Sequence, residues 1–278
     1  MKTDKKRNLE SKDAREASPL LPIVQSKSRR IGIWSGVRGE VNCDLGEGAG
    51  NDELIMPYIN SANIACGWHA GDADSIRQAI ESCLKHNVAI GAHPSFFDRQ
   101  NFGRTDMELP VQEIYELVTQ QLVVLNEMAA SLDATLQHVK PHGALYNISA
   151  RDPLSANVIA RAVKDFDSHL VLLGLSGSCS ISEAKKLGLK TLSEVFADRT
   201  YRDDGSLTPR SEPNALINET DKAVAQVLQM LQEGNVTTVS GKKIPILAET
   251  ICIHGDGKHA VEFAAAIHAA LTKERNAE

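Results

Sequence analysis

The chain has 278 residues, of which 42% are hydrophobic, a length and composition that suit one large globular domain with a sizeable apolar core. Its net charge of −6 is unevenly spread, because residues 1–39 carry ten basic and four acidic side chains and the remainder carries about −12. An acidic body argues against nucleic acid or an anionic membrane as the main partner. No apolar run approaches the ~20 residues that span a bilayer, and the N-terminus lacks the apolar stretch of a secretion signal.

Residues 1–39 are rich in Lys, Arg and Ser and keep no helical or strand period, so we expect them to be mostly disordered. We expect residues 40–278 to form a single β/α-barrel catalytic domain. Within it, short apolar runs predict strands near residues 40–44, 62–66, 88–92, 136–140, 170–174, 191–196 and 249–254. Helical periodicity or helix signals fill the intervals at residues 74–86, 111–131, 153–164, 178–187, 218–233 and 257–272.

This alternation predicts an α/β protein with a parallel sheet. Seven strands without a signal for a reversal of strand order favour a closed or nearly closed, TIM-like seven-stranded (β/α) barrel over an open sheet. Two segments interrupt the alternation. Residues 198–213 are long, polar and without apolar period, which is typical of a functional loop. Residues 236–248 are expected to form a hairpin that turns at Ser240, Gly241 and Lys242.

Polar clusters follow most of the predicted strands, which is where a barrel enzyme builds its active site. The catalytic candidates in these clusters are Asp44, Glu47, His69, His93 and His142, and the substrate-binding candidates are Lys140, Glu194, Asp198, Arg199, His254 and Asp256. The remaining histidines, including His138 inside a predicted strand, are interpreted as packed or surface residues. Six clusters at equivalent positions favour catalysis over packing.

The carboxylates Asp44 and Glu47 flank Gly46, and they could hold a metal, act as a general base or position an amine. Alternatively, they cap a helix at a glycine-rich turn. His69 and His93 follow the next two strands, so Asp44, His69 and His93 could converge on a divalent metal. The same three side chains equally suit a metal-free acid–base site.

Cationic candidates come from later strands. Lys140 could bind a carboxylate or phosphate as a point charge, and Arg199 could clamp a carboxylate with two hydrogen bonds. The alternatives are a solvated lysine at a proline-kinked strand end and a surface salt bridge. After Asp256, a glycine leads into a helix whose N-terminus could bind an anion.

Several common motifs are absent from the sequence. There is no Walker phosphate loop, no His-Glu-x-x-His, and the stretch at residues 174–178 misses Gly-x-Ser-x-Gly in its last position. The five cysteines, Cys43, Cys66, Cys83, Cys179 and Cys252, contain no Cys-x-x-Cys pair, so neither structural zinc nor a disulfide framework is expected. A reducing cytoplasm suits them, and we predict that location.

Six motifs in order resemble the LamB/YcsF family over roughly residues 40–272. They are NCDLGEG (42–48), SANIACGWHAGD (61–72), AIGAHPSFFDRQNFGR (89–104), VKPHGALYN (139–147), EVFADRTYRDDGSLTPR (194–210) and CIHGDG (252–257). Family members usually begin a few residues before the first motif, so residues 1–39 depart from the pattern. The resemblance implies a barrel related to the glycoside hydrolase and polysaccharide deacetylase superfamily.

The resemblance further implies ATP-dependent opening of 5-oxo-L-proline to L-glutamate, with ADP and phosphate released, together with 5-oxoprolinase subunits B and C. ATP is then a co-substrate of the complex. Our hypothesis is that the partners help activate the lactam, while Asp44 or Glu47 activates water and His142 and His254 donate to the oxyanion. Two alternatives remain: a metal-dependent deacetylase or amidohydrolase that acts alone, and a non-catalytic carrier of the lactam.

Overall fold

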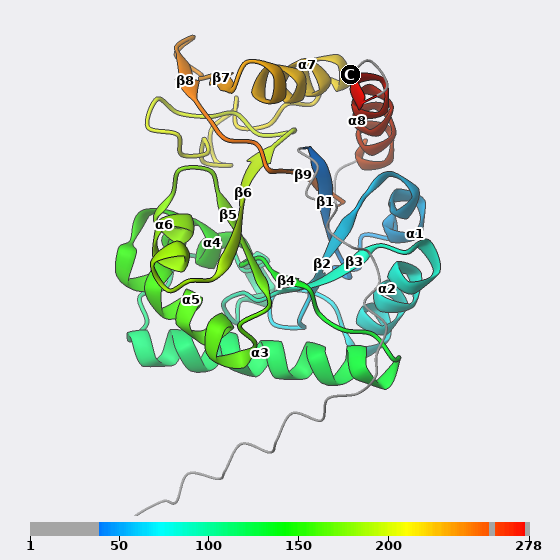
Figure 1. Cartoon of the computed structure of the whole chain (residues 1–278), viewed down its shortest axis with the longest axis vertical. Helices are drawn as coiled ribbons and strands as arrows, with labels where there is room; N and C mark the ends of the chain where they lie inside the picture. Colours follow the sequence, from blue (N-terminus) through cyan, green and yellow to red (C-terminus); the bar gives the residue numbers. More distant parts are fainter. Residues whose placement is uncertain (1–38, 256–258, 276–278) are drawn as a thin grey trace, which may run out of the picture.

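The computed structural model describes residues 39–255 and 259–275 and is built around a closed barrel of seven parallel strands (Figure 1). Their order around the barrel is β1-β2-β3-β4-β5-β6-β9. Their bounds are β1 (Glu40–Leu45), β2 (Ser61–Ala65), β3 (Ala89–His93), β4 (His138–Val139), β5 (Val171–Leu175), β6 (Lys190–Phe196) and β9 (Thr250–His254). The predicted seven-stranded barrel is therefore confirmed, whereas the predicted disorder of residues 1–39 falls, apart from Gly39, outside the described residues.

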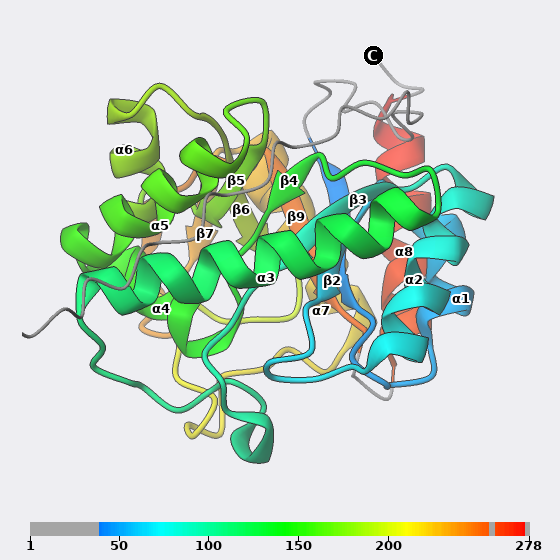
Figure 2. The same ribbon diagram turned by 90° about the horizontal axis from the view of Figure 1, so that it is seen from below.

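Helices surround the barrel (Figure 1), and the long α3 crosses one side of it next to α5 (Figure 2). The helices are α1 (Asp52–Ile55), α2 (Ala73–His86), α3 (Val111–Ser131), α4 (Gly143–Arg151), α5 (Pro153–Phe166), α6 (Cys179–Lys186), α7 (Thr220–Gln232) and α8 (Ala260–Arg275), with 3-10 turns at Met56–Tyr58 and Arg99–Asn101. Each of the six predicted helices has a counterpart. The short α1 and α4 were not predicted, because one or two helical turns show little periodicity.

Helix α2 shows how local sequence sets an element. The Asp72 side chain accepts a hydrogen bond from the Ser75 backbone N–H at 2.8 Å, and the Ser75 hydroxyl accepts one from the Asp72 N–H at 2.8 Å. This reciprocal capping box begins the helix. Asn87, at φ 58°, ends it in the left-handed conformation. The apolar face then packs on the barrel through Ile76, Ala79, Ile80 and Cys83.

The inside of the barrel is polar, which is unusual for a fold whose interior is commonly filled by branched apolar residues. The Asn63 amide on β2 donates to Asn42 Oδ1 at 2.7 Å and to Asp44 Oδ1 at 2.8 Å, and its own oxygen accepts from His138 Nε2 at 2.8 Å. All four residues are buried, so these hydrogen bonds offset the cost of removing polar groups from water.

Gly91 on β3 makes room for this network, because a Cβ atom there would come within 2.0 Å of His138 Nε2. We expect Gly91→Ala to lower the free energy of unfolding by about 1–3 kcal/mol, because the His138 ring cannot move away without losing its hydrogen bond to Asn63. Chemical denaturation would measure the loss. In a His138→Ala background the same substitution should cost much less, and an equal cost in both backgrounds would contradict the clash.

Two predicted irregular segments are also confirmed. Between β6 and α7 the chain forms only isolated bridges, Arg199 with Leu216 and Tyr201 with Leu207. The hairpin consists of β7 (Asn235–Thr237) and β8 (Lys243–Pro245), which pair antiparallel. In the part of the chain that the structure describes, no helix is both long enough and apolar enough to cross a membrane.

Candidate active site

The predicted polar clusters meet at one end of the barrel, because the carboxyl ends of parallel barrel strands all lie on the same side. In the strand registers, Asp44 on β1 lies beside Asn63 of β2 and His254 of β9. A cavity of about 850 Å³ opens at this end. Its wall includes seven of the predicted site residues, namely Asp44, Glu47, His93, Lys140, His142, Arg199 and His254.

Three more predicted residues lie directly behind this wall. His69 contacts Glu47, Glu194 contacts Lys140, and Asp198 contacts His254. Asp256, the last predicted residue, is outside the residues that the structure describes. The fold therefore brings ten predicted side chains together from strands that are far apart in the sequence.

Lys140 is the most completely paired charge of the site. Its Nζ lies 2.9 Å from Asp44 Oδ1 and 2.8 Å from Glu194 Oε1, and it donates to Cys252 Sγ at 3.0 Å. The side chain is only 2% exposed. Burial alone would lower the pKa of Lys140, but the negative groups around it raise that pKa well above 10.5. The charge that we expected Lys140 to offer to a substrate is already shared by two carboxylates of the protein.

Asp44 is a buried carboxylate that lies between a histidine and a lysine. Its Oδ2 lies 3.3 Å from His93 Nε2, while its Oδ1 accepts from Lys140 and Asn63. Burial would raise the pKa of Asp44, but its interactions with His93 and Lys140 outweigh burial and hold the pKa well below 3.8. Asp44 is thus a fixed negative charge at the floor of the cavity.

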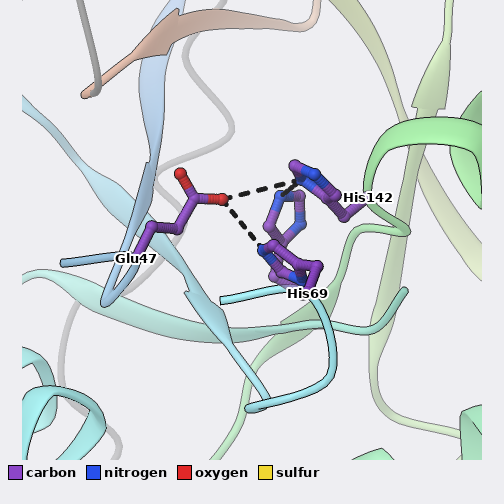
Figure 3. Close-up of side chains that lie close together, drawn as sticks. Glu47, His69 and His142 are labelled. Carbon is purple, nitrogen blue, oxygen red and sulfur yellow. Dashed lines mark hydrogen bonds and ion pairs between the residues drawn. The ribbon is translucent and has the colours of Figure 1, made fainter. Parts of the chain in front are cut away.

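Three histidines and a glutamate form a second cluster beside Asp44. Glu47 Oε1 lies 3.0 Å from His69 Nε2 and 3.6 Å from His142 Nδ1, and Figure 3 shows this carboxylate directed at both rings. The rings of His69 and His142 stack with centroids 3.8 Å apart. Gly103, at φ +66°, permits this packing, because a Cβ there would lie 2.9 Å from the His69 Cβ.

The cluster is deeply buried, and this sets its protonation. Burial, followed by the charge of His93, lowers the pKa of His69 to about 2. Burial and the neighbouring histidines also hold the pKa of His142 well below 6.5. Both rings are therefore neutral near pH 7, so each can use one nitrogen as a donor and the other as an acceptor or ligand.

Two groups of side chains could hold a metal ion. One consists of Glu47, His69, His93 and His142, and the other of Asp44, Cys252 and His254; the candidate ligand atoms within each group lie within 4.8 Å of one another. The set expected from the sequence was Asp44, His69 and His93. The structure divides that set between the two groups, because Glu47 rather than Asp44 faces the His69 ring.

The segment after β6 supplies further charges. His254 Nδ1 pairs with Asp198 Oδ2 at 2.7 Å. Arg199 is buried and donates to two backbone carbonyls, Thr208 O at 2.6 Å and Ala215 O at 3.3 Å. Burial and then the charge of Arg210 lower the pKa of Arg199 to about 10, although it stays protonated at neutral pH. Arg199 thus brings a positive charge to the cavity wall, where its guanidinium is held by backbone carbonyls.

A model of the LamB/YcsF family matches residues 40–277, which is most of the chain. The chain belongs to the LamB/YcsF family. Among curated relatives, the A subunit of the 5-oxoprolinase from Shouchella clausii is 56% identical over 230 residues, covering 81% of this chain and 91% of the relative. The corresponding A subunit from Bordetella pertussis is 50% identical over 240 residues, covering 84% of this chain and 95% of the relative.

A solved structure of the same fold is the lactam utilization protein from Thermus thermophilus. It is 40% identical to this LamB/YcsF chain and superposes with a TM-score of 0.80. The alignment covers 86% of this chain and 98% of that one. The family model and the solved structure therefore both match this chain over the whole barrel.

Some residues of this LamB/YcsF site were not singled out from the sequence. Cys252 accepts a hydrogen bond from Lys140, and Asn63 donates one to Asp44. Cys252 and Asn63 both lie inside predicted strands that are mostly apolar, so neither was recognised as a site residue. Arg104, Arg202 and Arg210 line the cavity with Arg199. A signal was present for Asn63, because a polar residue within an otherwise apolar strand needs a buried partner. The arginines are ordinary loop residues, and only the closed fold collects them.

Proposed function

We propose that this chain is the A subunit of a 5-oxoprolinase and that it takes part in the ATP-dependent cleavage of 5-oxo-L-proline to L-glutamate, with ADP and phosphate as the other products. The observation that carries the proposal is the cavity, in which an ionised carboxylate, Asp44, lies against a histidine, His93, and a cation, Arg199, lines the same wall. The names of the relatives supply the substrate class.

The chemistry explains why ATP and partners would be needed. The lactam C–N bond is a resonance-stabilised amide, so its carbonyl is a poor electrophile until it is activated. We propose that subunits B and C help to activate the carbonyl at the expense of ATP. Water then adds to the carbonyl carbon, the ring C–N bond breaks, and the nitrogen takes up a proton to become the amino group of glutamate.

Roles for the residues of this chain follow from their positions. Asp44, with His93 at 3.3 Å, would accept a proton from the attacking water. Arg199 would bind the substrate carboxylate, a role for which Lys140 is less suited because two carboxylates already surround it. His254, whose Nδ1–H donates to Asp198, would as an imidazolium donate its Nε2–H to the oxygen that becomes negative. Glu47 and His142 line the remaining wall, and His69 packs behind them.

The assembly and location are part of the same proposal. Subunits B and C are the expected partners, and a cytoplasmic location suits the five cysteines, all of which are free. Neither nucleic acid nor a membrane is expected as a partner, given the acidic barrel domain.

The decisive experiment measures glutamate formed from 5-oxoproline by the purified chain, with and without ATP and the candidate subunits B and C. We expect glutamate only in the complete mixture. Glutamate from this chain alone without ATP would favour the independent amidohydrolase instead. No glutamate in any mixture of well-folded components would overturn the assigned substrate.

A further inference from the structure

The histidine cluster has a hydrogen-bonding pattern that the lactam chemistry does not require. Each ring donates one N–H to an oxygen outside the cluster. His93 Nδ1 donates to the carbonyl of Lys140 at 2.7 Å, and His142 Nε2 donates to the carbonyl of Phe102 at 2.9 Å. A carbonyl oxygen can only accept, so in both rings a proton lies on the outward nitrogen.

His69 follows the same rule through a hydroxyl group. Its Nδ1 lies 2.9 Å from Ser95 Oγ, and the Ser95 hydroxyl donates its own proton to the Phe96 carbonyl at 3.0 Å. With the hydroxyl proton directed at that carbonyl, the Ser95 oxygen is the acceptor and His69 Nδ1 the donor. In their neutral forms, all three rings consequently direct an unprotonated nitrogen toward the centre of the cluster.

These lone pairs meet one another and two carboxylates, because His93 Nε2 also lies 3.3 Å from Asp44 Oδ2. His142 Nδ1 lies 2.9 Å from His93 Nε2, and His69 Nε2 lies 3.0 Å from Glu47 Oε1 (Figure 3 shows the Glu47 contacts). Two acceptors at hydrogen-bond distance repel unless a positive group lies between them. Without a metal ion, the first contact needs an extra proton on His93 or His142, and the second needs one on His69 or on the Glu47 carboxyl. Two extra protons would then lie in one buried cluster, in which the rings of His69 and His142 stack with centroids 3.8 Å apart.

We propose that Glu47, His69, His93 and His142 together bind one divalent transition-metal ion. A single ion would satisfy all four inward atoms once the stacked rings of His69 and His142 turn toward it. Histidine ligands of metals characteristically donate their other N–H to an oxygen, as these three do. Ligands about 2.0–2.1 Å from one ion lie no more than about 4.2 Å apart. Three of the six separations meet that limit: 2.9 Å between His93 and His142, 3.0 Å between Glu47 and His69, and 3.6 Å between Glu47 and His142. All six are within 4.8 Å.

The donor set indicates which ions would bind. Three imidazole nitrogens and one carboxylate oxygen suit zinc, cobalt or nickel, whereas magnesium and calcium prefer oxygen ligands. Glu47, His93 and His142 line the cavity, so an ion held by them would be accessible to a molecule bound there. The inference is independent of the lactam assignment, because it rests on hydrogen bonds within this chain.

The test measures metal binding by the full chain without an affinity tag. After chelator treatment, the protein is titrated with Zn²⁺ and with Co²⁺ by calorimetry, and its metal content is determined after dialysis. We expect one ion per chain. His69→Gln should weaken binding by at least about 100-fold, more than the loss of an outer-shell partner usually does.

The matched control is His169→Gln. His169 also pairs with a carboxylate, Asp167, at 3.0 Å, but its side chain is 77% exposed and belongs to neither candidate metal group, so this variant should bind metal normally. Ser95→Ala removes only the acceptor that orients His69 and should weaken binding by about 10–100-fold and shift the visible spectrum of bound Co²⁺.

Two results would overturn the proposal: no stoichiometric binding of either ion by the folded, chelator-treated chain, or wild-type affinity in both His69→Gln and Ser95→Ala. Ser95→Ala keeps the test decisive if His69→Gln does not fold. Because metal content is read directly, failure here is distinguishable from failure to form glutamate.

Discussion

Replacing Lys140 by methionine is expected to lower the free energy of unfolding by about 3–5 kcal/mol, the usual cost of leaving a buried charge without its partner. Methionine matches the length of lysine, so little packing is lost. Asp44 and Glu194, however, would remain buried without the ammonium group, which lies 2.9 Å from the first and 2.8 Å from the second. In a domain of this size the melting temperature should fall by about 6–20 °C.

This loss should depend on pH in a defined direction. A buried carboxylate without a cation has a raised pKa, so the folded variant holds more protons than the unfolded chain. Stability of Lys140→Met should therefore decrease as the pH rises above about 4 and continue to fall until it passes the raised pKa. Denaturation curves at several pH values would show this.

The control is Lys222→Met, which removes an exposed lysine that pairs with Glu219 on the surface. Its effect should stay within about 0.5 kcal/mol. Adding Glu194→Gln to Lys140→Met should recover part of the lost stability, because one of the two unpaired charges is gone. A Lys140→Met protein as stable as the wild type would show that the buried ion pairs are not formed.

Asp44→Asn is expected to lower the rate of glutamate formation by the complete enzyme by about 10²–10⁴-fold, the range that general acid–base catalysis contributes. Asparagine keeps an oxygen that can accept from Asn63 and Lys140, but it cannot take a proton from water. The measurement is the initial rate with ATP and both partner subunits present, alongside a melting curve that verifies folding.

Asp167→Asn provides the comparison, because Asp167 is a partly exposed carboxylate that pairs with His169 and does not line the cavity. Its rate should equal that of the wild type. Full activity in Asp44→Asn would show that Asp44 is not the general base, and Glu47 would then be the candidate for that role. Loss of activity together with loss of assembly would instead identify Asp44 as a structural residue.

Much of the barrel was predictable because its signals are local. Apolar runs such as residues 88–92 and periodic helices such as residues 111–131 reflect burial of one strand or one helix face. The position of the site was predictable for a simple topological reason, since parallel strands end on the same side. Short elements such as α4, with nine residues, escaped because two turns do not establish a period.

Which side chains of the site pair with one another was not predictable from the sequence. Lys140 was expected to face a substrate, yet it is held by Glu194 on β6. Asp44 was grouped with His69, yet Glu47 faces that ring. Separations along the sequence say nothing about such contacts, because they depend on how the strands stagger when the barrel closes.

The sequence by itself determined the strand–helix alternation, the family and the end of the barrel where the polar side chains gather, because each depends on patterns within one segment or one motif. Only the tertiary structure decided which carboxylate neutralises Lys140, which nitrogen of each histidine donates outward, and that Glu47 completes the histidine cluster. These are contacts between residues on different strands, and their geometry exists only once the barrel has closed and excluded water from its interior.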